Sequence, residues 1–136
     1  MTTLDSLEIQ TDIREEHGVQ IREQLCPENW TEVDSYSACH TMPDYYGVRH
    51  QSEIARVLKA VGLTIVCLTT RRTQLNPMGS GPGGRVRLGD DMMNSTYRIA
   101  VPENEKEQAA NAIEAHSNAV KAWIAGEAEM PAVLRS

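Results

Sequence analysis

The residue types that could perform chemistry in this 136-residue chain are three cysteines, four histidines and scattered carboxylates. A cysteine nucleophile needs a base and an orienting carboxylate close by. Suitable residue types occur at Cys39, His40, His50, Asp34 and Asp44. No spacing typical of a catalytic family joins them, so we interpret them as ordinary turn residues and predict that the protein is not an enzyme.

Zinc binding is the second chemistry that these residue types allow. The candidate ligands are Cys26, Cys39, His40, His50 and Cys67. Structural zinc sites usually contain close Cys-x2-4-Cys pairs, because a tight knuckle orients two ligands at once. The chain has no such pair, so we predict neither a metal nor another cofactor. The remaining histidines, His17 and His116, are interpreted as packing or surface residues of helices.

Basic side chains gather in the middle of an acidic chain. The formal net charge is −6, made up of −7 over residues 1–42, +4 over residues 43–101 and −3 over residues 102–136. The stretch from Ile54 to Gly89 contains no acidic residue. A localised basic sector indicates an anionic partner, and the acidic flanks would limit nonspecific binding. A chance fluctuation of charge is the alternative explanation.

Four helices are predicted along the chain, and they would position the charged, cysteine and histidine side chains. Leucines and isoleucines at helical spacing predict a helix over residues 3–25, and Thr31 as a cap predicts a short one over Glu32–Cys39. The clearest pattern is Ser52–Val61, where Ser52 can cap a helix that ends at Gly62. A last helix is predicted from Asn104, as its cap, to a stop at Gly126.

Two strands are predicted between the third and fourth helices. The segments 63–70 and 95–101 are rich in β-branched residues, and they would be the arms of a long hairpin whose tip is basic and rich in glycine. Trp30 and Tyr36 are expected to supply bulk to the core, because the chain contains no phenylalanine. For Tyr45 and Tyr46 the sequence leaves core packing and partner contact open.

The order helix, turn, Ser52–Leu63 helix, strand Thr64–Thr70, basic loop and strand at Tyr97–Ile99 resembles a winged helix-turn-helix over residues 31–101. The resemblance implies an α+β fold with a winged-helix-like core flanked by N- and C-terminal helices. It also implies binding of duplex DNA through the Ser52–Val61 helix and the hairpin wing, in transcription regulation or another DNA transaction. The residues expected to contact DNA are Gln51, Ser52, Arg56, Lys59, Arg71, Arg72, Arg85, Arg87 and Arg98.

The alternative function is that of a small phage-type accessory protein, which the chain resembles in size and polarity. Such a protein would modulate a larger protein assembly by docking its basic hairpin on an acidic surface. The alanine-rich side of the last helix could pack on the core or form a homodimer. We further expect a single domain over residues 1–126, a frayed tail over residues 127–136, no membrane span and a cytoplasmic location.

Overall fold

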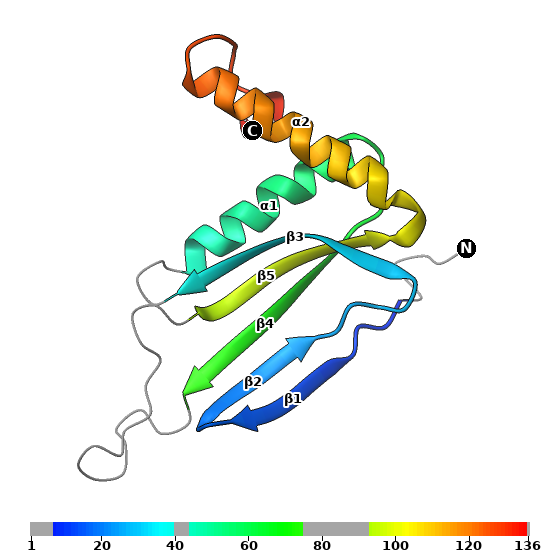
Figure 1. Cartoon of the computed structure of the whole chain (residues 1–136), viewed down its shortest axis with the longest axis vertical. Coiled ribbons are helices and arrows are strands. Elements are labelled where there is room, and N and C mark those ends of the chain that lie inside the picture. The colour runs from blue at the N-terminus through cyan, green and yellow to red at the C-terminus, as the bar shows by residue number, and fades with distance from the viewer. Residues whose placement is uncertain (1–6, 40–43, 75–92, 136) are drawn as a thin grey trace, which may run out of the picture.

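The computed structural model describes residues 7–39, 44–74 and 93–135 and has an α+β fold. Its five strands form one antiparallel sheet in the order β1-β2-β4-β5-β3. Both helices lie on the β3 side of this sheet, and the β1–β2 hairpin forms the opposite edge (Figure 1). The strands are β1 Thr11–Glu16, β2 Val19–Gln24, β3 Trp30–Cys39, β4 Val66–Gln74 and β5 Met93–Pro102, and the α-helices are α1 Asp44–Ala60 and α2 Lys106–Ile124.

The N-terminal segment is a β-hairpin, so the prediction of a helix over residues 3–25 is wrong for the part that the structure describes. β1 pairs with β2 from Thr11 opposite Gln24 to Glu16 opposite Val19. The two turn residues between the strands, His17 and Gly18, have φ values of 52° and 80°. Left-handed backbone at both positions matches the twist of a two-residue hairpin. Gly18 therefore belongs to the turn that reverses the chain.

The second predicted helix, Glu32–Cys39, is also wrong, because these residues belong to β3. β3 pairs with β5, and the register shifts between Glu32 and Asp34. A bulge of this kind adds a residue to one strand and interrupts the alternation of faces. With β3 in place of a helix, the described residues contain no helix ahead of α1 that could form a helix-turn-helix.

The predicted helix Ser52–Val61 is confirmed as part of α1, which is longer at its N-terminus and ends one residue sooner. Ser52 is therefore inside the helix and does not cap it. Gly47 lies where α1 crosses β5, and a Cβ atom at Gly47 would be 2.3 Å from the Tyr97 ring. At the other end Gly62 has a φ of 84°, which confirms the predicted C-terminal stop.

The two predicted strands are confirmed as β4 and β5, which pair antiparallel from Val66 opposite Ala100 to Arg71 opposite Ser95. They are the arms of one hairpin, as predicted. The basic tip falls largely on residues 75–92, so Arg85 and Arg87 lie outside the described residues.

The C-terminal helix is confirmed as α2, although the predicted Asn104 cap is not. Residues Glu103–Glu105 form a 3-10 turn, and no side chain caps α2. The helix ends near Gly126, as predicted, with a φ of 78°. Beyond it, where a frayed tail was expected, Ala132–Leu134 form a 3-10 turn that packs against α1.

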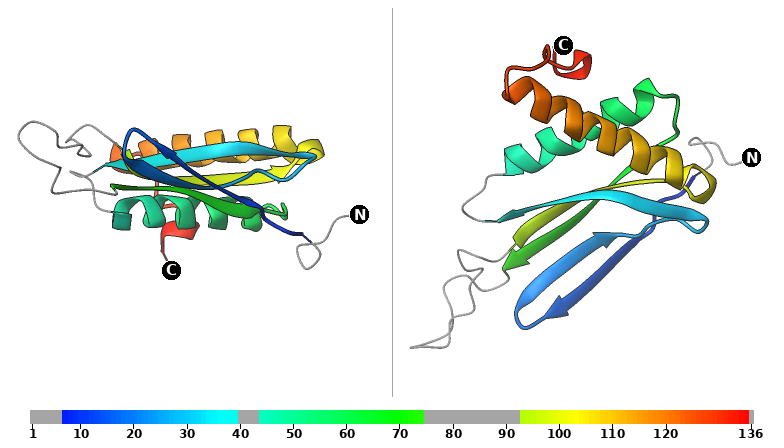
Figure 2. Two further views of the ribbon diagram at one scale, coloured as in Figure 1. Left: turned by 90° about the horizontal axis from the view of Figure 1, so that it is seen from below. Right: turned by 45° about the horizontal axis from the view of Figure 1, so that its top comes forward.

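The core lies between the helices and the β3–β5 part of the sheet (Figure 2). Ile54 and Leu58 of α1 pack on Ile99 and Val101 of β5, and Ala109 of α2 closes the cluster. A smaller cluster on the other face of the sheet contains Trp30, whose predicted burial is confirmed, with Leu68 and Ala100. Among the described residues, neither helix is long and apolar enough to cross a membrane.

Candidate functional site

Of the helical residues expected to contact DNA, Gln51 is turned toward the sheet. Its side-chain amide donates to the carbonyl oxygens of Leu68 and Arg98, at 3.2 Å and 2.9 Å. This corrects the sequence prediction, because an amide used between α1 and two strands is not available to read a base. Ser52 remains exposed on the solvent side of α1.

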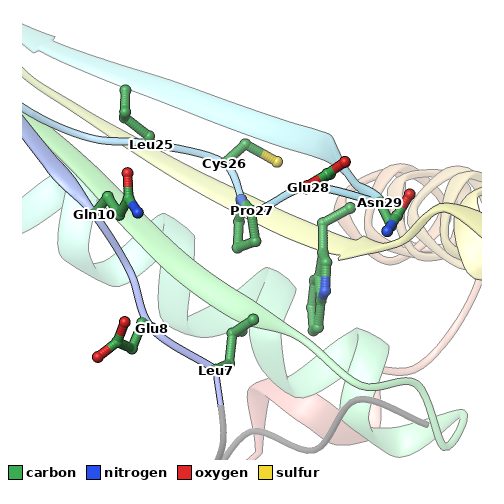
Figure 3. Close-up of a pocket in the computed structure, with 9 residues that line it drawn as sticks. Leu7, Glu8, Gln10, Leu25, Cys26, Pro27, Glu28 and Asn29 are labelled. Atoms are coloured by element: carbon green, nitrogen blue, oxygen red, sulfur yellow. The ribbon is translucent and has the colours of Figure 1, made fainter.

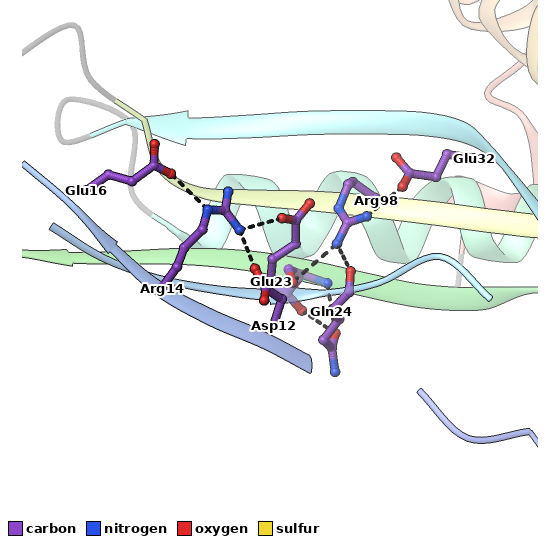
Figure 4. A network of polar contacts seen from close by, with 8 residues as sticks. Asp12, Arg14, Glu16, Glu23, Gln24, Glu32 and Arg98 are labelled. Carbon is purple, nitrogen blue, oxygen red and sulfur yellow. Dashed lines mark hydrogen bonds and ion pairs between the residues drawn. The ribbon is translucent and has the colours of Figure 1, made fainter. Parts of the chain in front are cut away.

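Arg98 is the second correction to the expected DNA-binding set. The residue is only 7% exposed, and its side chain connects β5 with three other strands. The guanidinium donates to the Glu32 carboxylate of β3 at 2.6 Å, to the Gln24 carbonyl oxygen of β2 and to the Thr69 carbonyl oxygen of β4 at 3.4 Å (Figure 4). Arg98 therefore holds the sheet together and is not exposed to a ligand.

Arg71 and a residue that sequence reasoning missed, Arg22, lie directly opposite each other on β4 and β2. Cys67 pairs with Ile99, whose side chain lies under α1, so alternation along β4 puts Arg71 on the helix-bearing face. α1 packs on β3 and β5, so the β2–β4 part of this face extends beyond the helix.

Lys59 of α1 borders the same part of the face. Partial burial raises the pKa of the Cys67 thiol, and the charge of the Lys59 ammonium opposes that rise, which places Lys59 toward the start of β4, four residues before Arg71. We call the surface formed by Arg22, Arg71 and Lys59 the basic shelf. All three side chains are exposed. Alternation along β2 could have suggested Arg22, had residues 19–24 been interpreted as a strand.

Among the arginines of the expected set that the structure describes, Arg56 and Arg72 face elsewhere. Arg72 follows Arg71 and so lies on the opposite face, where it donates to the Thr96 hydroxyl at 3.4 Å. Arg56 of α1 donates to the Val133 carbonyl oxygen at 3.4 Å, toward the C-terminal 3-10 turn. The structure thus puts Lys59 and Arg71 from the predicted set on the helix-bearing side of the sheet, four β4 residues apart, and directs Arg56 and Arg72 elsewhere.

The face opposite the basic shelf carries a network around Arg14. Its guanidinium contacts Asp12 at 2.7 Å, Glu16 at 2.8 Å and Glu23 at 3.0 Å (Figure 4). Three carboxylates around one guanidinium leave this face of the hairpin with a negative balance. The hairpin therefore has an acidic face and, across the sheet, a face that carries Arg22.

Two histidine–carboxylate pairs occupy the space between α1, α2 and β3. His50 Nε2 lies 3.0 Å from Asp34 Oδ2, and the ring stacks on Tyr36 at 4.9 Å between centroids. His116 Nε2 lies 2.6 Å from Glu53 Oε2, and the side chain of His116 is buried. Asp34 and His50 could be named from the sequence as residue types. The Glu53–His116 contact left no signal there, because its partners are 63 residues apart.

A cavity of about 460 Å³ lies at the end of the sheet beside Trp30, bounded by Leu7 and the segment between β2 and β3 (Figure 3). Cys26 lines it, and burial raises the pKa of this thiol, with a further rise from Glu32. A thiol held protonated is a poor nucleophile. Among the described residues, no three histidine, cysteine or carboxylate side chains are arranged to hold a metal ion.

The fold and surface define a small α+β protein with a partly covered antiparallel sheet and one basic shelf. Comparisons of the chain with protein-family models, with curated proteins and with solved structures find no match.

Proposed function

We propose that the protein binds duplex DNA through the basic shelf, as a small regulatory or accessory protein. The observation that carries this proposal is the register of Arg22 opposite Arg71, with Lys59 on the same side of the sheet nearer the start of β4. Two guanidinium groups in register on neighbouring strands can both donate to one phosphate of a polyanion that lies across the strands.

Duplex DNA fits this surface better than single-stranded nucleic acid. Single-strand binding relies on aromatic side chains on which bases stack. The side chains that share the shelf face on β2 and β4 are those of Gln20, Gln24, Thr69 and Thr73, which offer no stacking surface. The two glutamine amides and the Thr73 hydroxyl can donate hydrogen bonds to phosphates, whereas the Thr69 hydroxyl donates to Gln24. The proposal therefore rests on phosphate contact by a sheet face and does not require the recognition helix of a winged helix-turn-helix.

Fluorescence anisotropy with a random-sequence duplex across a salt series tests this function. The shelf variant Arg22→Gln/Lys59→Gln/Arg71→Gln should bind more weakly, and its log–log salt slope should fall by about 0.9 for each phosphate that the variant no longer neutralises. A matched variant, Arg56→Gln/Lys106→Gln/Arg135→Gln, removes the same charge from residues outside the shelf. Equal weakening in both variants, or no binding by the wild-type protein at low salt, would overturn the proposal.

A second candidate function is docking on a protein, which exposed apolar side chains near the end of α2 support. Tyr46, Trp123 and Ile124 are all exposed, and the first two border a depression of about 390 Å³. Aromatic residues of this kind are enriched at protein interfaces. If this surface joins two copies of the chain, sedimentation equilibrium should show a dimer that Trp123→Ser weakens. If the wild-type protein and the Trp123→Ser variant are both monomers, this surface does not form a homodimer.

A further inference from the structure

A cavity of about 360 Å³ lies between α1, α2 and β3, and none of the basic-shelf residues lines it. Its volume is near the lower end of the range for small-molecule sites. Its apolar wall comes from Ile54, Ile113 and Val120. The polar groups at its border are the two histidine–carboxylate pairs, the Ser117 hydroxyl and the Lys121 ammonium. An apolar wall with a few polar groups is the usual composition of a ligand site.

The two pairs determine which polar atoms a ligand could use. An ionised carboxylate only accepts hydrogen bonds, so Nε2 of each imidazole carries the hydrogen that it donates to Asp34 or Glu53. The ring nitrogen left for another partner is Nδ1 in both His50 and His116. A protonated imidazole balances the charge of its carboxylate partner, and the Lys121 ammonium is then the unmatched charge of the lining.

We propose that this cavity binds a small organic anion, a carboxylate with an apolar body of about the size of one ring. The apolar body would lie against the wall formed by Ile54, Ile113 and Val120. The carboxylate would accept hydrogen bonds from the Lys121 ammonium, the Ser117 hydroxyl and an imidazolium Nδ1–H. Charge-assisted hydrogen bonds of this type are stronger than those between neutral groups.

The protonation of His50 links ligand affinity to pH. The hydrogen bond from His50 to Asp34 raises the pKa of His50, and partial burial opposes the rise, while the charges of Asp34 and Glu53 add to it. The other charged groups that border His50 are Arg49 of α1 and Lys121 of α2. Because the imidazolium donates through both nitrogens, binding of the anion should be tighter at pH 6 than at pH 8.

Titration of the uniformly 15N-labelled protein with benzoate at pH 6, followed through the imidazole resonances by NMR, tests the site. Benzoate should give saturable shifts at both His50 and His116, and benzylamine, which has the same apolar body and the opposite charge, should not. Absence of saturable shifts with benzoate, or equal shifts with benzylamine, would overturn the proposal. Both outcomes are independent of DNA binding.

Two lysine variants then locate the anion. Lys121→Gln should weaken benzoate binding roughly tenfold, as expected for removal of one charge-assisted hydrogen bond. Lys106→Gln removes the same charge from the start of α2, outside the cavity, and should leave the affinity unchanged. Both lysines are exposed, so folding should be preserved. Equal effects of the two variants would show general charge attraction and would overturn a site in this cavity.

Discussion

The β3–β5 half of the sheet and the β1–β2 hairpin are built from the same antiparallel pairing, but only the first is covered by helices. Ile99 and Val101 of β5 are completely buried, as is Leu58 of α1. In β1, by contrast, every residue is exposed. β1 therefore owes its structure to backbone pairing and to the His17–Gly18 turn, whereas Val19 of β2 is buried. A segment released from core packing can carry charged side chains such as Arg22.

The largest expected effect comes from breaking the covered half. Leu58→Ala removes a side chain with 0% exposure from the main cluster. The decrease in unfolding free energy should be about 3 kcal/mol, within the usual range for buried leucine. Urea denaturation measures it, with Val61→Ala as the control because Val61 is 56% exposed. If Leu58→Ala lowers the unfolding free energy as little as Val61→Ala does, Leu58 is not buried against β5 in solution.

The second largest effect is expected from substitution of Arg98, which joins β5 of the covered half to β2 of the hairpin. Arg98→Met should cost about 2 kcal/mol, because its partners are left without charge-assisted hydrogen bonds. Amide hydrogen exchange should also become faster in β2, where the Gln24 carbonyl oxygen no longer has its donor. Arg72→Met is a suitable control on the same face of the sheet, since Arg72 makes one long hydrogen bond to Thr96. If exchange in β2 is unchanged, Arg98 does not hold the hairpin.

Within the covered half, sequence reasoning succeeded for α1, β4 and β5 but not for β3. The helix Ser52–Val61 could be predicted because its apolar stripe and Gly62 are local signals. The paired strands at residues 63–70 and 95–101 followed from their β-branched residues. Burial on one face produced these patterns in α1, β4 and β5.

The hairpin half and β3 carried weaker signals. Ile9, Ile13 and Ile21 fit a helical spacing, although Ile13 and Ile21 in fact lie on opposite faces of the hairpin. In β3 the bulge between Glu32 and Asp34 breaks the alternation that would have indicated a strand.

The candidate sites depend on contacts that sequence distance conceals. Arg22 and Arg71 become neighbours only through the β2–β4 pairing. Glu53 and His116 meet only because α2 packs beside α1. The histidines and arginines could be named as residue types, but their partners depend on how distant elements pack.

A change of pH should have a smaller effect on the unfolding free energy, through the His50–Asp34 pair of the covered half. The pKa of His50 is raised in the folded protein, chiefly by its hydrogen bond with Asp34. The stabilisation that this pair provides is therefore complete below the ordinary histidine pKa and disappears as pH rises through the raised value. The difference in unfolding free energy between the wild-type protein and His50→Gln should be larger at pH 5.5 than at pH 8.5. A difference that grows with pH would contradict the His50–Asp34 pair.

The smallest effect on the unfolding free energy is expected from a substitution in the β1–β2 hairpin. Ile13 is 52% exposed and lies opposite Arg22 on the shelf face, so Ile13→Thr should change the unfolding free energy by no more than about 0.5 kcal/mol. Urea denaturation at several protein concentrations provides the measurement. A decrease close to that of Leu58→Ala would mean that Ile13 is buried in solution. Dependence of that decrease on protein concentration would identify a second copy of the chain as the cover, and the basic shelf would then be part of an interface between proteins instead of a surface for DNA.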